Sequence, residues 1–167
     1  MLSQRLVAAL DGVPVPAPAA VLDLAAVRAN ARALQLRAGG LPLRLATKSV
    51  RCRWVLDRTE LGFTGLMTYS AAESLWLARH GHRDLLLAYP TADRAALAEL
   101  VADPQLRDQV TVMVDHPEHL DLLRAAGAGP TRPVRVCLDV DASLRLGPVH
   151  VGVRRSPVHS HAQAAAA

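Results

Sequence analysis

The sequence predicts an α/β fold, an incomplete (β/α)8 barrel of the TIM type with about five parallel strands and intervening helices. Short apolar runs alternate with helical patterns at spacings of roughly 20 to 25 residues, which is typical of parallel strands joined by right-handed crossovers. A complete barrel takes about 250 residues, whereas the chain has 167. A small doubly wound sheet would be complete at this length, but no G-x-G-x-x-G motif or Walker loop follows any predicted strand.

The first 18 residues are predicted to form an N-terminal segment with a proline-rich connector, followed by the partial barrel over residues 19–167. Residues 1–10 have the pattern of a short helix, and the three prolines between positions 14 and 18 favour an extended connector. Residues 20–23 are predicted as a short strand. Asp23 can then cap a helix that runs to about Ala38, where two glycines end it.

The rest of the chain repeats a strand and a helix. Ser70 and Glu73 have the spacing of a capping box, and Pro117 fits the first turn of a helix. The apolar runs and these helix signals predict strands over residues 43–46, 65–69, 84–89, 110–114 and 134–140, and helices over residues 51–60, 70–81, 92–101 and 117–127.

Lys48 is the first candidate for a catalytic residue. It is the one lysine among 19 lysine and arginine residues, and it follows directly on the predicted strand at residues 43–46. A primary amine can form a Schiff base, which a guanidinium cannot, so a sole lysine at the carboxyl end of a parallel strand indicates chemistry that needs the amine. The alternative is a surface lysine in an arginine-rich chain.

Composition argues against several other classes of function. The net charge of +4 comes from scattered arginines, and 3% aromatic residues leave little to stack on bases, so we expect no nucleic-acid partner. Cys52 and Cys137 have no metal-binding spacing and are consistent with reduced cysteines. No apolar run has the length of a signal peptide or a membrane span, so a cytoplasmic protein without a membrane partner is expected.

Four segments together resemble one family. Residues 43–49 are similar to the cofactor-lysine strand of the fold-type III pyridoxal 5′-phosphate enzymes, which share the alanine racemase N-terminal barrel. Residues 68–90, 112–118 and 139–147 are similar to the later strands of that barrel. The closest likeness is to amino-acid deaminase/aldolase, D-threonine aldolase-like and D-serine dehydratase-like proteins.

The resemblance implies a pyridoxal phosphate enzyme that acts on D-amino acids as a deaminase, dehydratase or aldolase. Lys48 would carry the cofactor as a Schiff base and move the substrate proton, and Arg145 would lie near the cofactor's phenolic oxygen. Arg44 would add charge at the barrel mouth if strand alternation placed it beside Lys48, although a surface ion pair is an equal alternative. Tyr69 and Tyr89 end strands and could contact the cofactor, or could simply pack at the rim. An amino-acid racemase, a non-catalytic pyridoxal phosphate-binding protein and an inactive fragment remain alternatives.

The resemblance also bears on metals and partners. The seven histidines have no recognised zinc signature, and the metal ligands of the full-length family lie in a C-terminal β-domain that we do not find here, so no metal site is predicted. The family's later strands and its phosphate loop would lie beyond Ala167, and we expect the chain to be catalytically incomplete on its own. A D-amino acid is the expected small-molecule partner, and a homodimer is compatible with the family.

Acidic residues near the strand ends have more ordinary explanations. Glu73 is interpreted as part of the capping box. Asp139 and Asp141 share a face of their strand, so one of them could bind the turn that follows, or both could be solvated.

Overall fold

The computed structural model describes residues 4–16 and 18–166, except for the side chains of Arg5 and Arg145. It divides the chain into two compact units. The first comprises residues 1–43 with 59–62, and the second comprises residues 44–58 with 63–167.

The first unit contains helices α1 (Gln4–Leu10) and α2 (Leu24–Ala38) and a 3-10 turn, η1 (Thr59–Leu61). Asp23 caps α2 as predicted, because its carboxylate accepts hydrogen bonds from the backbone N–H groups of Ala25 and Ala26. Gly39 ends α2 in the left-handed conformation at φ 59°. The strand predicted over residues 20–23 is wrong, since no described strand pairs with these residues.

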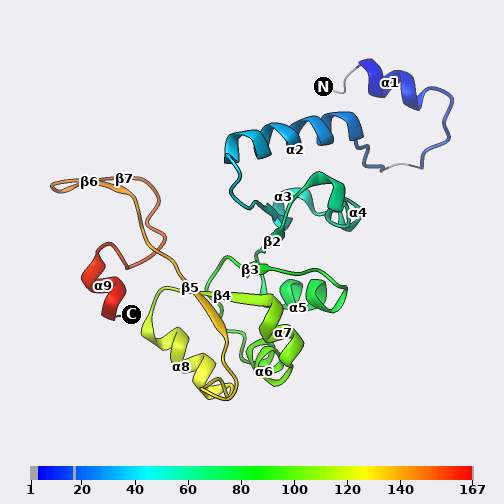
Figure 1. The fold of residues 1–167 in the computed structure, drawn as a ribbon. Coiled ribbons are helices and arrows are strands. Elements are labelled where there is room, and N and C mark those ends of the chain that lie inside the picture. Colours follow the sequence, from blue (N-terminus) through cyan, green and yellow to red (C-terminus); the bar gives the residue numbers. More distant parts are fainter. Residues whose placement is uncertain (1–3, 17, 167) are drawn as a thin grey trace. The chain divides into compact units, whose positions relative to one another are not determined.

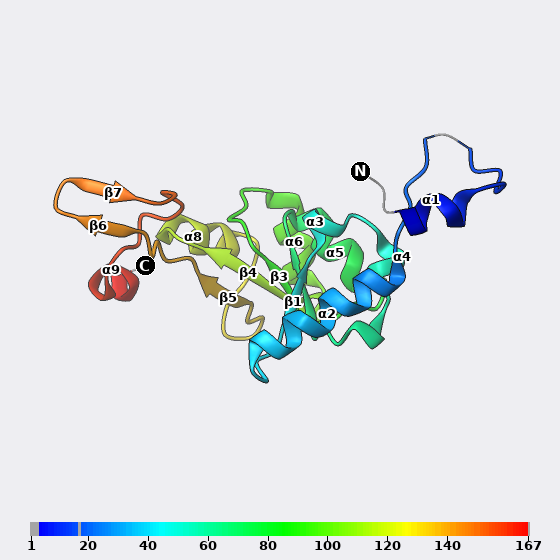
Figure 2. The ribbon, with the colours of Figure 1, turned by 90° about the horizontal axis from the view of Figure 1, so that it is seen from above.

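The second unit is built on a five-stranded parallel sheet (Figure 1, Figure 2). Its strands lie in chain order, so each strand pairs with the next one in the sequence. This order is that of a barrel wall, whereas a doubly wound sheet reverses direction at a switch point. The predicted fold class, an incomplete α/β barrel with five parallel strands, is therefore confirmed. The strands are β1 (Arg44–Ala46), β2 (Gly65–Thr68), β3 (Leu85–Leu87), β4 (Val110–Val114) and β5 (Arg135–Leu138).

Helices connect these strands at the predicted places, with three differences. The helix predicted over residues 51–60 is reduced to α4 and the separate turn η1. Two short helices were not predicted, α3 directly after β1 and α7 after α6. Asp103 starts α7, because its carboxylate accepts a hydrogen bond from Gln105 N, and Pro104 occupies the first turn. The helices are α3 (Thr47–Val50), α4 (Arg53–Leu56), α5 (Ala71–Arg79), α6 (Arg94–Ala102), α7 (Pro104–Gln109), α8 (Pro117–Ala125) and α9 (His161–Ala166).

A two-stranded antiparallel hairpin follows β5, where the sequence indicated only a turn. Its strands are β6 (Leu144–Leu146) and β7 (Val149–Val151), seen as a separate ribbon in Figure 2. Gly147 adopts φ 57° between them, a conformation that a β-branched residue would resist.

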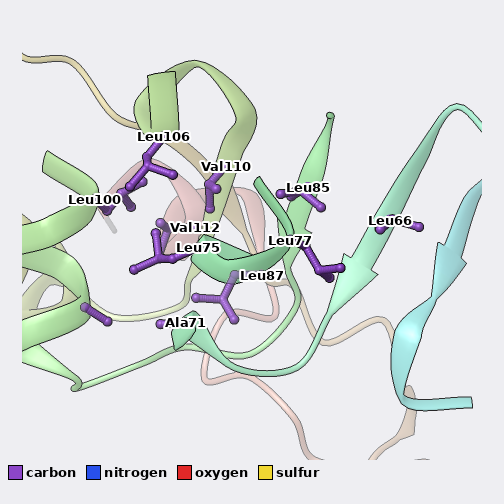
Figure 3. Close-up of a cluster of buried hydrophobic side chains, with 11 residues drawn as sticks. Leu66, Ala71, Leu75, Leu77, Leu85, Leu87, Leu100, Leu106, Val110 and Val112 are labelled. Carbon is purple, nitrogen blue, oxygen red and sulfur yellow. The ribbon is translucent and has the colours of Figure 1, made fainter. Parts of the chain in front are cut away.

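The main core lies between one face of the sheet and helices α5, α6 and α7 (Figure 3). Leu85 and Leu87 alternate with Leu86 along β3, so both point to this face and both are fully buried. Leu77 of α5 is buried to the same degree. The intervening residues of the strands, such as Leu86, are only half-buried on the other face. No helix in the described residues is both long and apolar enough to span a membrane.

Replacing Leu85 with alanine tests this core. Because Leu85 is 0% exposed, Leu85→Ala should lower the free energy of unfolding by about 2 to 5 kcal/mol. Leu146→Ala is the control, since Leu146 is 61% exposed and its loss should change stability by less than about 0.5 kcal/mol. Urea unfolding followed by circular dichroism measures both. Equal effects of the two substitutions would contradict the assigned core.

Candidate functional site

Lys48 lies at the carboxyl edge of the sheet, in the helical turn α3 that begins directly after β1. Its amine donates a hydrogen bond to the hydroxyl of Tyr89, with Nζ and Oη 2.9 Å apart. Tyr89 follows β3, so the parallel sheet brings the carboxyl ends of β1 and β3 to one place. Both side chains remain accessible to solvent. Two of the residues proposed from the sequence are thus in direct contact.

Tyr89 is approached by a second cation, Arg155. The guanidinium carbon of Arg155 lies 5.2 Å from the centre of the Tyr89 ring, within the range of a cation–π contact. The hydrogen bond from Lys48 and the charge of Lys48 lower the pKa of the Tyr89 phenol below its ordinary value of 10.0, and the charge of Arg155 adds to this effect. Sequence reasoning missed Arg155, whose only local signal is the consecutive pair Arg154 and Arg155.

Tyr69, at the end of β2, also lies beneath a cation. The guanidinium carbon of Arg51 lies 5.6 Å from the centre of its ring. Arg51 ends α3 in the left-handed conformation, and its Nε donates a hydrogen bond to the backbone oxygen of Lys48 at 3.1 Å. Tyr69 is therefore linked to Lys48 through Arg51, and no direct contact between the two is found among the described residues.

Glu73 ties the start of α3 to β2 and α5. Its Oε2 accepts a hydrogen bond from Thr47 Oγ1 at 2.9 Å and another from the backbone N–H of Tyr69 at 3.2 Å. Ser70 caps α5 by accepting from Glu73 N, as the capping box predicts. The carboxylate of Glu73, however, reaches Thr47, which is 1% exposed and immediately precedes Lys48. Glu73 thus does more than cap a helix.

Arg44 is found away from this group. It forms an ion pair with Asp84 at 2.8 Å, at the amino ends of β1 and β3. The alternation argument for Arg44 was wrong in one respect, because Thr47 begins a helical turn and the strand periodicity stops at Ala46. The structure matches the ion-pair alternative. Arg145 lies in β6, and its side chain falls outside the described part of the structure.

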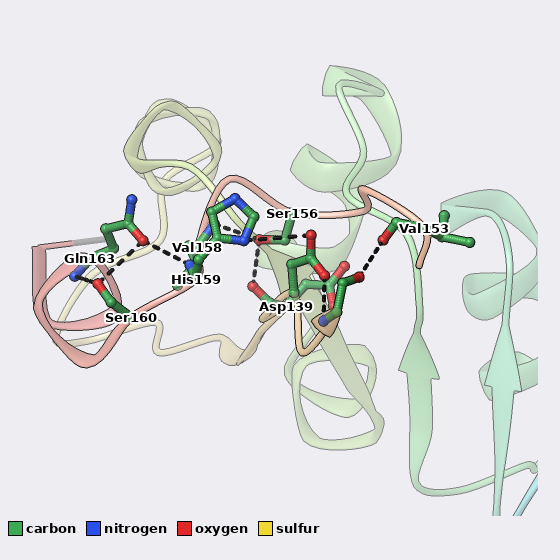
Figure 4. A network of polar contacts seen from close by, with 9 residues as sticks. Asp139, Val153, Ser156, Val158, His159, Ser160 and Gln163 are labelled. Atoms are coloured by element: carbon green, nitrogen blue, oxygen red, sulfur yellow. Dashed lines mark hydrogen bonds and ion pairs between the residues drawn. The ribbon is translucent and has the colours of Figure 1, made fainter. Parts of the chain in front are cut away.

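The segment that carries Arg155 is hydrogen-bonded to the residues that follow β5 (Figure 4). Ser156, which is buried, donates a hydrogen bond to the backbone oxygen of Asp139 at 2.8 Å and accepts one from Val158 N at 3.0 Å. The backbone N–H of Asp141 donates in turn to Val158 O at 2.8 Å. These bonds hold Ser156 and Val158 against the residues that follow β5, at the carboxyl edge of the sheet.

Asp141 anchors the turn before the hairpin. Its Oδ1 accepts a hydrogen bond from the backbone N–H of Ser143 at 2.8 Å, and its Oδ2 lies 3.5 Å from His159 Nδ1. The hydrogen bonds from Ser143, followed by the charges of His159 and His150, lower the pKa of Asp141. Of the two roles considered for Asp139 and Asp141, the structure assigns turn binding to Asp141.

Two histidines of the described chain each contact one carboxylate. His119 contacts Asp115 at 3.1 Å, and His82 contacts Asp57 at the same distance. Burial lowers the pKa of His82, against the opposing effect of Asp57. No three His, Cys, Asp or Glu side chains come together in a metal-binding arrangement within residues 4–16 and 18–166.

Comparison with known proteins provides a family and a fold. The family model described as alanine racemase, N-terminal domain, matches residues 22–165. The structure resembles the crystal structure of D-threonine aldolase from Filomicrobium marinum, with a TM-score of 0.68 and 24% identity over 90% of this chain and 39% of that chain. It also resembles D-threo-3-hydroxyaspartate dehydratase from Delftia sp. HT23, with a TM-score of 0.66 and 23% identity over 85% of this chain and 38% of that chain.

The similarity to the two solved structures covers part of their length and concerns the fold. At such low identity the two solved structures establish a shared fold. The chain spans less than two fifths of the length of either one. The comparison with curated protein sequences found no match.

The Asp141 contacts predict a specific pH dependence of stability. Because folding lowers the pKa of Asp141 below its ordinary value of 3.8, its ionised form stabilises the fold above that pH, and this contribution is lost as the pH falls below it. Asp141→Asn should therefore destabilise the protein by a constant amount above about pH 5 and by progressively less at lower pH. Urea unfolding at a series of pH values measures the difference from wild type.

Asp121→Asn is the matched control, because Asp121 forms an exposed ion pair with Arg124 within α8. Its effect should stay small at every pH. A difference between wild type and Asp141→Asn that does not change between pH 6 and pH 3 would contradict the role given to the carboxylate.

Proposed function

Since the chain belongs to the alanine racemase N-terminal domain family, we propose that it is the lysine-bearing part of a pyridoxal phosphate-dependent enzyme that acts on D-amino acids. The reaction we propose is elimination or aldol cleavage, of the deaminase, dehydratase or aldolase type. The observation that carries the proposal is the sole lysine, Lys48, at the carboxyl edge of the sheet with its amine hydrogen-bonded to Tyr89. The two similar structures, a D-threonine aldolase and a D-threo-3-hydroxyaspartate dehydratase, support the substrate class.

The residues at this edge fit pyridoxal phosphate chemically. The cofactor has an aldehyde, which a primary amine can attack, and it is an anion, which cations favour. Lys48 provides an accessible amine, and Arg51 and Arg155 place guanidinium groups over the rings of Tyr69 and Tyr89. We propose that Lys48 attaches the cofactor covalently and that Tyr69 and Tyr89 contact it. When bound, pyridoxal phosphate supplies an electron sink for the bond that breaks next to the substrate nitrogen.

Tyr89 can accept a proton from the Lys48 amine. The amine must lose a proton before it can act as a nucleophile. Tyr89 Oη, at 2.9 Å, is within the distance at which a general base accepts a proton. The two cations that lower the pKa of Tyr89 stabilise its phenolate, so Oη can accept a hydrogen bond from the ammonium and release a proton to solvent at a lower pH than an ordinary tyrosine.

Thr47 and Glu73 orient the lysine. Thr47 is buried, and its hydroxyl is hydrogen-bonded to Glu73 and, at 3.3 Å, to the backbone oxygen of Met67. These bonds fix the first residue of α3 against β2. Lys48 therefore extends from a backbone that is held in place, which is the condition for precise positioning of its amine.

Covalent labelling tests the proposal. The protein is mixed with pyridoxal phosphate, reduced with borohydride and digested, and the peptides are weighed. The expected adduct lies on Lys48, with trypsin failing to cut after the modified lysine, so that residues 45–51 form one labelled peptide. A visible absorbance band should form before reduction and should be missing in denatured protein.

Lys48→Arg is the matched variant, because it keeps the positive charge and removes the primary amine. It should lose the band and the labelled peptide while it retains the circular dichroism spectrum of the wild type. Labelling confined to the N-terminal amine, or equal labelling of folded and denatured protein, would contradict the proposed role of Lys48.

A further inference from the structure

Arg155 differs in its surroundings from four other arginines of the sheet-bearing unit. Those four pair with carboxylates, namely Arg44 with Asp84, Arg53 with Asp57, Arg79 with Glu99 and Arg124 with Asp121. Arg155 has no carboxylate within ion-pair distance among the described residues, and its guanidinium faces the Tyr89 ring. Arg155 is exposed, so an anion from solvent can reach its guanidinium.

Lys48, like Arg155, has no carboxylate partner among the described residues. Its amine donates to the neutral hydroxyl of Tyr89, and in the described part of the chain no carboxylate forms an ion pair with it. Two cations therefore converge on one phenol, Lys48 from α3 and Arg155 from the segment after β7. Convergent cations without a counter-charge repel each other, and an anion bound between them would relieve that repulsion.

The backbone at Arg155 is held in place. Arg155 directly precedes Ser156, which is buried and hydrogen-bonded to Asp139 O and Val158 N. The hydrogen bond between Asp141 N and Val158 O fixes the same segment a second time. A side chain on a fixed backbone loses less conformational entropy when it binds a ligand. This favours a ligand-binding role for Arg155 over that of a mobile surface charge.

We propose that Arg155 and Lys48 form an anion-binding site at Tyr89 in the cofactor-free protein, and that Arg155 takes the carboxylate of the amino-acid substrate when Lys48 carries the cofactor. A guanidinium binds a carboxylate through two parallel hydrogen bonds. In an amino acid the carboxylate and the amine are attached to the same carbon, so a carboxylate held by Arg155 beside Tyr89 brings the substrate amine close to the Lys48 side chain. The identity of the ligand rests on the proposed function, whereas the anion site itself does not.

Tyr89 can report directly on this site. The chain has two tyrosines, so a Tyr69→Phe background leaves Tyr89 as the only phenol, and its ionisation can be followed by ultraviolet absorbance against pH. Arg155→Ala in this background should raise the pKa of Tyr89, because one of the charges that lower it is lost. Arg154→Ala, one residue earlier, is the matched control and should leave the pKa unchanged.

Anions are then added to the same protein at constant ionic strength, with chloride as the reference for general screening. Acetate should raise the pKa of Tyr89 in a saturable way, because a bound carboxylate neutralises the nearby cations. In Arg155→Ala the apparent affinity for acetate should fall roughly tenfold or more, and Arg155→Lys should recover part of it.

The titrations test the anion site and its preference for a carboxylate separately. A saturable response to inorganic phosphate and none to acetate would overturn the carboxylate assignment, since the site would then suit a phosphate group. No response beyond that of chloride, or an equal response in Arg155→Ala, would overturn the anion site. The titration contains no cofactor, so failure of Lys48 to attach pyridoxal phosphate would refute the proposed function and leave this result unaffected.

Discussion

The parallel register of β1, β2 and β3 is the constraint on which the candidate site depends. Ala46 lies opposite Met67, and Thr68 lies opposite Leu87, so the residues that follow these three strands emerge at the same edge. A shift of one residue would send each side chain to the other face. The Thr47 to Glu73 hydrogen bond then fixes the turn that carries Lys48. Register brings the groups to one place, and hydrogen bonds at the strand ends orient them.

Features that depend on local sequence were predictable. The five strands follow from apolar runs, the cap at Asp23 from its side chain, and the place of Lys48 after β1 from the apolar run before it. Features set by distant contacts were not. Arg155 meets Tyr89 only because Ser156 is hydrogen-bonded to the end of β5, and nothing near position 155 encodes that bond. Residues 20–23 have a strand-like composition, yet a strand also needs a paired neighbour, which a local pattern cannot supply.

Cations of the sheet-bearing unit have different kinds of partner. Away from the carboxyl edge, Arg53, Arg79 and Arg124 pair with carboxylates across or along helices, and each such exposed pair contributes little to stability. At that edge, Lys48, Arg51 and Arg155 face tyrosine rings and a phenol hydroxyl instead. The aromatic rings partly satisfy the cations without neutralising them, so the positive charge stays available to a small anionic ligand. The proposed anion site thus rests on the two cations beside Tyr89, rather than on the net charge.

The open ends of the parallel sheet have a consequence for how the protein behaves with other chains. Within the described residues, β1 has a hydrogen-bonded neighbour only in β2, and β5 only in β4. The outer backbone N–H and C=O groups of these strands can pair with any extended segment that reaches them. Two copies meeting at such edges would continue a single sheet. Self-association should therefore rise with protein concentration and should be suppressed by a peptide that occupies an edge, a property of the backbone that is independent of the chemistry at Lys48.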